Sequence, residues 1–119
     1  MTIQAQASQH SIVLHMAGSM AAGDFAQLHR RLVRLLSSRR NRIVLDFSDV
    51  EHVSYRDASR LGAEFELVRS HAGDMKVAGL SPYVRNILLL AGLHDLLEMH
   101  TSAPERGNRT GTARVPLAS

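Results

Sequence analysis

One ten-residue stretch, VSYRDASRLG at positions 53–62, concentrates side chains that could do chemistry. It follows the apolar run IVLDF and opens an amphipathic segment, so its polar groups are expected at the start of a helix. Hydroxyls, a phenol and an arginine–aspartate pair in this place could form a catalytic site, a phosphate site, a docking surface or a helix cap. The candidate partner-binding residues are Ser54, Tyr55, Arg56, Asp57, Ser59 and Arg60.

Ser54 and Asp57 have a simple structural interpretation. Their S-x-x-D spacing is a variant of the capping box, in which the hydroxyl accepts a hydrogen bond from the third helical amide and the carboxylate reaches back. Arg56 has no such role, because a cation in the first helical turn opposes the helix dipole by about 0.3 to 1 kcal/mol. We therefore expect a cap at Ser54. For Arg56 we expect either a partner or a solvated side chain paired with Asp57 or Glu51.

Other residues favour neither catalysis nor cofactor binding. The chain has no cysteine and its seven histidines lack the spacing of a metal site, so we expect no metal and no cofactor. No serine stands in a G-x-S-x-G elbow, and no glycine run matches a phosphate loop. The carboxyl ends of parallel strands, where functional groups gather, would fall at 46–57 and 80–83. Asp46 could accept a phosphoryl group or bind a metal there, but both roles usually need further acids close by, and the N-terminal hairpin offers none. Asp46 is more simply a strand-end residue that caps the next turn. We expect no enzyme.

The basic residues are almost all arginines, with Lys76 the only lysine, and the formal net charge is +3. Acids are interspersed through 46–98, so nucleic-acid binding is not expected despite the excess of base. One arginine group could attract an acidic partner, although arginines near a helix C-terminus are also favoured by the dipole and simply solvated. That group is Arg30, Arg31, Arg34, Arg39, Arg40 and Arg42, and three more arginines lie in the tail at 106, 109 and 114.

Hydrophobic periodicity alternates between strand and helix along the chain. Strands alternating with helices of this length imply parallel crossovers in one sheet, and hence an α/β fold. The predicted order is ββαβαβαβ. Two strands over 3–7 and 12–16, joined by a turn, come before a helix over 22–37 and a strand over 43–47 that is covered on both faces. A helix from 54 to 71, a strand over 75–78, a helix capped by Ser81 and a strand over 96–99 follow.

The composition predicts one domain over residues 1–101 and a disordered basic tail over 102–119. The N-terminal segment has neither a basic region nor an apolar core of the kind that signal peptides carry. The longest nearly unbroken apolar run, 87–93, is too short to cross a bilayer. We expect a cytoplasmic protein that does not insert into membranes.

Two segments resemble the STAS domain of bacterial anti-sigma factor antagonists, also called anti-anti-sigma factors. They are DFSDV at 46–50 and the L-S-P-x-V-x-x-I pattern that runs from Leu80 to the AGL at 91–93. The resemblance covers about residues 2–101. It implies a small mixed, mainly parallel sheet with an N-terminal hairpin and helices packed on it. The usual final helix of the family has no counterpart in the polar tail.

The resemblance also implies a function. Such proteins bind an anti-sigma factor that is a serine kinase, and phosphorylation in a D-S-[ST]-G motif at the start of the second helix ends the binding. Aligned without gaps, this motif falls on 54–57 and puts Arg56 in place of the phosphorylated residue. A gapped alignment instead matches DASRLG at 57–62 and makes Ser59 the acceptor, with Ser54 as a further candidate for modification. The ungapped alignment predicts a protein without the usual switch.

We therefore expect a protein-interaction module that binds an anti-sigma factor or a related regulatory kinase and so relieves sigma-factor inhibition. The partner would belong to the same regulatory system. One alternative is a STAS subunit of another assembly, such as a lipid-transport complex or a stress-signalling scaffold. Formation of a homodimer is left open.

Overall fold

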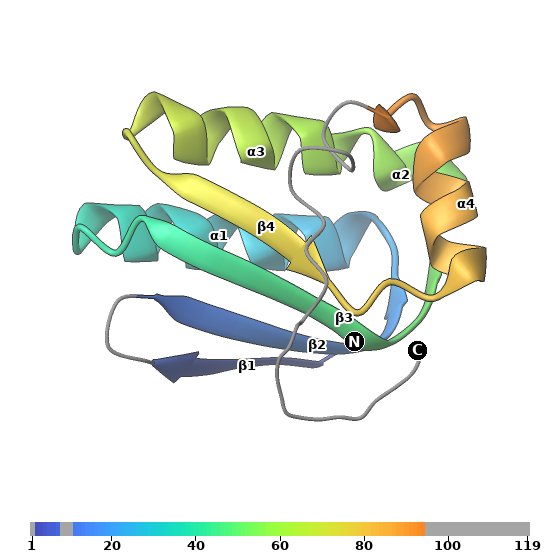
Figure 1. Ribbon diagram of the computed structural model, residues 1–119, viewed down its shortest axis with the longest axis horizontal. Coiled ribbons are helices and arrows are strands. Elements are labelled where there is room, and N and C mark those ends of the chain that lie inside the picture. The colour runs from blue at the N-terminus through green and yellow to red at the C-terminus, as the bar shows by residue number, and fades with distance from the viewer. Residues whose placement is uncertain (1, 8–10, 95–119) are drawn as a thin grey trace.

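Four strands form one sheet in the computed structural model, which describes residues 2–7 and 11–94 (Figure 1). The strands are β1 (Thr2–Ala7), β2 (Ile12–Met20), β3 (Arg42–Val53) and β4 (Asp74–Ala78). The helices are α1 (Ala22–Ser37), α2 (Tyr55–Ala58), α3 (Arg60–Ser70) and α4 (Pro82–Leu90). No helix in the described ranges is long and apolar enough to span a bilayer.

The spatial order of the strands equals their order in the chain, β1-β2-β3-β4. β1 pairs with β2 antiparallel, whereas β2 with β3 and β3 with β4 are parallel. These pairings confirm the α/β prediction of a mixed, mainly parallel sheet that starts with an antiparallel pair. The predicted strand at 96–99, the domain boundary at 101 and the tail over 102–119 lie outside the described residues.

One face of the sheet carries the core. Leu14, Leu45 and Val77 alternate with more exposed residues on three neighbouring strands, and each has 0% of its surface exposed. Helices α1 and α3 lie against this face (Figure 1). The predicted apolar stripe of α1 is confirmed, since its buried residues are Phe25, Leu28, Leu32 and Leu36. The expectation that the central strand is covered on both faces is wrong, because its opposite face, with Val44 and Asp46, stays partly exposed.

β3 is much longer than the predicted strand over 43–47 and continues to Val53. Its second half is polar, with only Val50 and Val53 buried, so the strict alternation that marks a strand is lost. The register between β2 and β3 shifts between His15 and Ala17 and again between Gly18 and Ser19. Such irregularities let a strand keep pairing while its side-chain period changes. The long strand carries the chain directly to the segment with the candidate functional residues.

Candidate partner-binding site

The segment 54–60 begins where β3 ends, at the carboxyl edge of the parallel part of the sheet (Figure 1). The Ser54 N–H donates to the Met20 carbonyl at 2.9 Å, which ties the segment to the last residue of β2. The short helix α2, of four residues, follows at once. The structure thus keeps the predicted candidate residues together at the end of two neighbouring strands, as expected for functional groups on a parallel sheet.

The predicted cap at Ser54 is wrong. The Ser54 side chain makes no capping hydrogen bond. The Asp57 N–H, which a capping hydroxyl would accept from, donates instead to the Ser54 backbone carbonyl at 3.0 Å. The Asp57 carboxylate does not reach back but accepts from Arg60 Nε at 3.2 Å. The two amides that a capping box would serve already have backbone partners, since the Ser54 N–H donates to the Met20 carbonyl and the Asp57 N–H to the Ser54 carbonyl.

Tyr55 and Arg56 project from α2 into solvent. Tyr55 is 62% exposed, and Arg56 is exposed too. Within residues 2–7 and 11–94, the Arg56 side chain makes neither a hydrogen bond nor an ion pair. Its expected pairing with Asp57 is absent because Asp57 is occupied by Arg60, and no pairing with Glu51 is present either. The helix thus exposes a cation without a described partner beside a large aromatic ring.

Ser59 lies at a break in the predicted helix. The sequence predicted one continuous helix with Ser59 a turn inside it, whereas the structure ends α2 at Ala58 and starts α3 at Arg60. The backbone of Ser59 stays right-handed (φ −62°, ψ −19°), and its carbonyl accepts from the Gly62 N–H at 3.0 Å. Its exposed hydroxyl makes no capping bond. Ser59 is therefore an accessible hydroxyl at the start of an eleven-residue helix.

Two residues outside the predicted set join this surface. His52, near the end of β3, packs its ring on Tyr83 in the first turn of α4, with ring centres 5.7 Å apart and ring planes at 28°. The Tyr83 hydroxyl also lies 2.7 Å from His52 Nδ1, in hydrogen-bonding contact. The pair fixes the start of α4 against the end of β3. His52 and Tyr83 fall in the two strand-end segments that the sequence singled out, 46–57 and 80–83, but neither was named as a candidate partner-binding residue.

Large exposed apolar side chains gather on the same elements. Within the described residues there are four, and one of them, Val33, lies on α1. The other three are on α2 and α4, which pack against each other: Tyr55, Tyr83 and Leu90. We call α2 and α4, with His52 and the Ser59–Arg60 junction, the docking surface. Tyrosine and arginine are the residue types enriched in protein interfaces and in their energetic hot spots.

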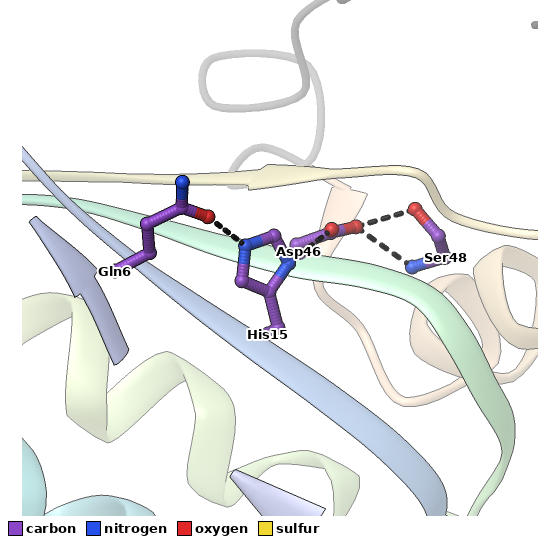
Figure 2. A network of polar contacts seen from close by, with 4 residues as sticks. All are labelled: Gln6, His15, Asp46 and Ser48. Carbon is purple, nitrogen blue, oxygen red and sulfur yellow. Dashed lines mark hydrogen bonds and ion pairs between the residues drawn. The ribbon is translucent and has the colours of Figure 1, made fainter. Parts of the chain in front are cut away.

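Asp46 lies on the partly exposed face of the sheet, in a polar network shown in Figure 2. Its Oδ1 accepts from the Ser48 N–H at 3.0 Å and from the Ser48 hydroxyl. The interpretation of Asp46 as a strand-end cap on the next turn is wrong, because β3 continues to Val53 and both residues lie within the strand. Its Oδ2 lies 2.8 Å from His15 Nδ1, and His15 Nε2 lies 3.0 Å from Gln6 Oε1. The network links three strands. In the part of the chain described, no three His, Asp or Glu side chains gather as they would around a metal ion.

The first arginine group does not form a site of its own. Arg31 donates from Nη2 to the Ile3 carbonyl at 3.2 Å and so holds β1 against α1. The remaining members are exposed and lie in the C-terminal half of α1, in the turn that follows it and, for Arg42, at the first residue of β3. This placement agrees with solvated arginines near a helix C-terminus.

Comparison with solved structures finds the same fold in proteins of low sequence identity. The unphosphorylated anti-sigma factor antagonist SpoIIAA matches with a TM-score of 0.71 at 15% identity, covering 87% of this chain and 90% of that one. An anti-sigma factor antagonist from Mycobacterium paratuberculosis matches with a TM-score of 0.70 at 18% identity, covering 87% and 86%. RsbS from Moorella thermoacetica, in a form with serine replaced by glutamate, matches with a TM-score of 0.70 at 20% identity, covering 84% and 85%.

A search of curated protein sequences finds no match to this chain. The family comparison is decisive instead, because the STAS domain matches residues 2–105, which is most of the chain. The match agrees with the strand order, the antiparallel β1–β2 pair and the helices on one face. The chain belongs to the STAS domain family.

Proposed function

We propose that this STAS protein binds an anti-sigma factor, or a related regulatory kinase, through the docking surface and so relieves inhibition of a sigma factor. The observation that carries the proposal is the exposed Arg56, whose side chain has no partner among the described residues and which lies near the exposed side chains of Tyr55, Tyr83 and Leu90. The solved proteins of the same fold that are named anti-sigma factor antagonists support this role. The protein acts by binding and carries out no catalysis.

The contact is not switched by phosphorylation at position 56. Phosphoserine would add close to two negative charges and break an interface by repulsion and desolvation, whereas arginine carries a fixed positive charge that no kinase alters. The binding is then constitutive or regulated in another way. Ser59 is the competing candidate, since its hydroxyl is exposed and a helix begins after it. Ser54 is only partly exposed and its amide is tied to β2, which makes it the poorer acceptor.

Binding is tested by titrating the purified protein with the anti-sigma factor encoded in the same genome. Arg56→Ala is compared with Arg40→Ala, because Arg40 is also exposed and lacks a described side-chain partner. We expect Arg56→Ala to weaken binding about tenfold or more, as a hot-spot truncation of about 1.4 kcal/mol or more does. Arg40→Ala should leave the affinity unchanged. Equal affinities for both variants would remove Arg56 from the interface.

The absence of the switch is tested separately, by incubation with the same partner and ATP followed by intact mass measurement. We expect no phosphate on the wild-type protein. Stoichiometric phosphate that is lost in Ser59→Ala, but kept in Ser54→Ala, would establish Ser59 as the acceptor and refute the proposed loss of the switch.

The same docking surface could serve a STAS subunit of another assembly, such as a lipid-transport complex or a stress-signalling scaffold. The partner recovered by affinity purification separates these roles: an anti-sigma factor supports the first, and a transport ATPase or a larger scaffold the second. Arg56→Ala should reduce recovery of the partner in either case.

A further inference from the structure

The outer edge of β1 is unpaired within the part of the chain that the structure describes. In an antiparallel pair, alternate residues direct their N–H and C=O groups to the neighbouring strand, and the residues between them direct these groups outward. About half of the backbone groups of Thr2–Ala7 therefore face away from β2. Apart from Ile3, every residue of this strand is exposed. An edge of this kind is a template for a further strand.

β1 is held to the fold from both sides. On the helix-covered face, Arg31 on α1 donates to the Ile3 carbonyl at 3.2 Å. On the opposite face, Gln6 Oε1 lies 3.0 Å from His15 Nε2, and His15 in turn contacts Asp46 on β3 (Figure 2). The edge is thus fixed in register before anything pairs with it. A preorganised strand loses less conformational entropy on pairing than a loose one.

The two edges of the described sheet differ in charge. β4 carries Asp74 and Lys76, the kind of charged side chains that protect an edge strand against pairing. β1, with the sequence TIQAQA, has no charge and no proline. Two copies of it can therefore approach without repulsion. Its small alanines also leave room beside Ile3 of a second copy on the helix-covered face.

We propose that the outer edge of β1 binds the β1 strand of a second copy, antiparallel across a two-fold axis, and joins two sheets into one. Side chains that lie opposite each other in a strand pair share a face, so a two-fold axis must pair one residue with the same residue of the second copy. Near the middle of β1, that central residue is Gln4 or Ala5. Centred on Gln4, it sets the two Gln4 side chains opposite each other. Centred on Ala5, it sets Gln4 against Gln6 and leaves the two Gln4 side chains on a diagonal. The surface is self-complementary, as a two-fold interface requires, and the inference does not rest on the proposed function.

The test is the molar mass in solution, measured by light scattering after gel filtration over a wide concentration range. The wild-type protein should be a dimer. Gln4→Lys should be a monomer, because like charges opposite or diagonal across a strand pair repel. Gln4→Glu should also be a monomer, and an equimolar mixture of the two variants should recover the dimer mass. Ala63→Lys, which adds the same charge on the exposed face of α3, should remain a dimer.

A monomeric wild-type protein would overturn the proposal, and so would a dimer that both Gln4 variants leave intact. Recovery of the dimer on mixing shows that each variant is folded, because an unfolded strand could not restore the pairing. Circular dichroism of each variant alone checks the fold independently.

Discussion

Glu64 is the one charged residue that is buried in the described part of the chain, with 6% of its surface exposed. It lies on α3 facing α1, and its Oε1 is 2.9 Å from His29 Nδ1. A carboxylate removed from water needs a hydrogen-bonding partner, because an unsatisfied polar group in the interior is costly. His29 is about half exposed and supplies that partner from the neighbouring helix. The pair therefore fixes the position of α1 relative to α3.

Removing this partner should destabilise the protein. We expect His29→Ala to lower the free energy of unfolding by about 1 to 3 kcal/mol, the usual effect of leaving a buried acceptor unsatisfied. The measurement is urea unfolding at constant neutral pH. The exposed pair of Arg69 and Glu66 is the control, since Arg69→Ala should cost only about 0 to 1 kcal/mol. Equal losses for the two variants would show that Glu64 gains nothing from His29.

Glu64 also shows which buried residues a sequence pattern fails to predict. The apolar positions Leu61, Phe65 and Val68 were predicted as the buried face of this helix, and all three are buried. Glu64 lies on the same face but is polar, and its partner is 35 residues away in the chain. Helical periodicity describes one helix at a time. It therefore predicts that the apolar residues of a helix are buried. It does not predict which polar residue is buried because a second helix supplies its hydrogen-bonding partner.

At the scale of elements, two serines were predicted to cap helices and only one does. Ser81 accepts a hydrogen bond from the Val84 N–H at 3.1 Å, and Pro82 follows it in the first helical turn. Ser54 makes no such bond. The sequence signals look alike, but α4 has nine residues and α2 only four. At the shorter helix, two backbone hydrogen bonds take the place of the cap: the Ser54 N–H donates to Met20 on β2, and the Asp57 N–H donates to the Ser54 carbonyl.

The two serines should differ in their effect on stability. We expect Ser81→Ala to lower the free energy of unfolding by about 1 kcal/mol, as the loss of a capping hydroxyl does. Ser54→Ala should change it by less than about 0.5 kcal/mol, as surface substitutions away from such features do. Chemical denaturation of both variants, each compared with the wild type, provides the measurement. A loss at Ser54 as large as that at Ser81 would restore the capping box that the sequence predicted.

The elements that were predicted well are those with a strong local signal. The helix over 22–37 was predicted with the bounds that the structure gives it, because an apolar stripe and an acid in its first turn agree. The second half of β3 was missed because its pairing with β2 depends on register shifts that no single strand encodes. The break at Ser59 was missed for a related reason. The apolar spacing continues across it, so periodicity indicates one helix where the structure has two.

At the scale of the whole molecule, the sequence predicted the fold class and the segment 54–60, and the sheet brings other elements to that segment. α4 is far from α2 in the chain, yet the parallel crossover places both beyond the carboxyl end of β3 (Figure 1). His52 and Tyr83 meet there across 31 residues of sequence. β1, by contrast, lies at the outer edge of the sheet, on the far side of β2 from β3. The docking surface and the β1 edge thus belong to different elements.

This separation predicts that partner binding and self-association can be removed one at a time. Gln4→Lys should lose the dimer but keep the wild-type affinity for the anti-sigma factor. Arg56→Ala should lose affinity but keep the dimer, because substitutions at distant sites without shared contacts act additively.

The affinity is measured by calorimetric titration in solution, so that avidity from a two-fold binder on a surface does not contribute. The double variant should show both losses at the size of the single ones. A change of molar mass in Arg56→Ala, or a loss of affinity in Gln4→Lys, would instead mean that the partner binds across the two copies and that β1 pairing builds part of its site.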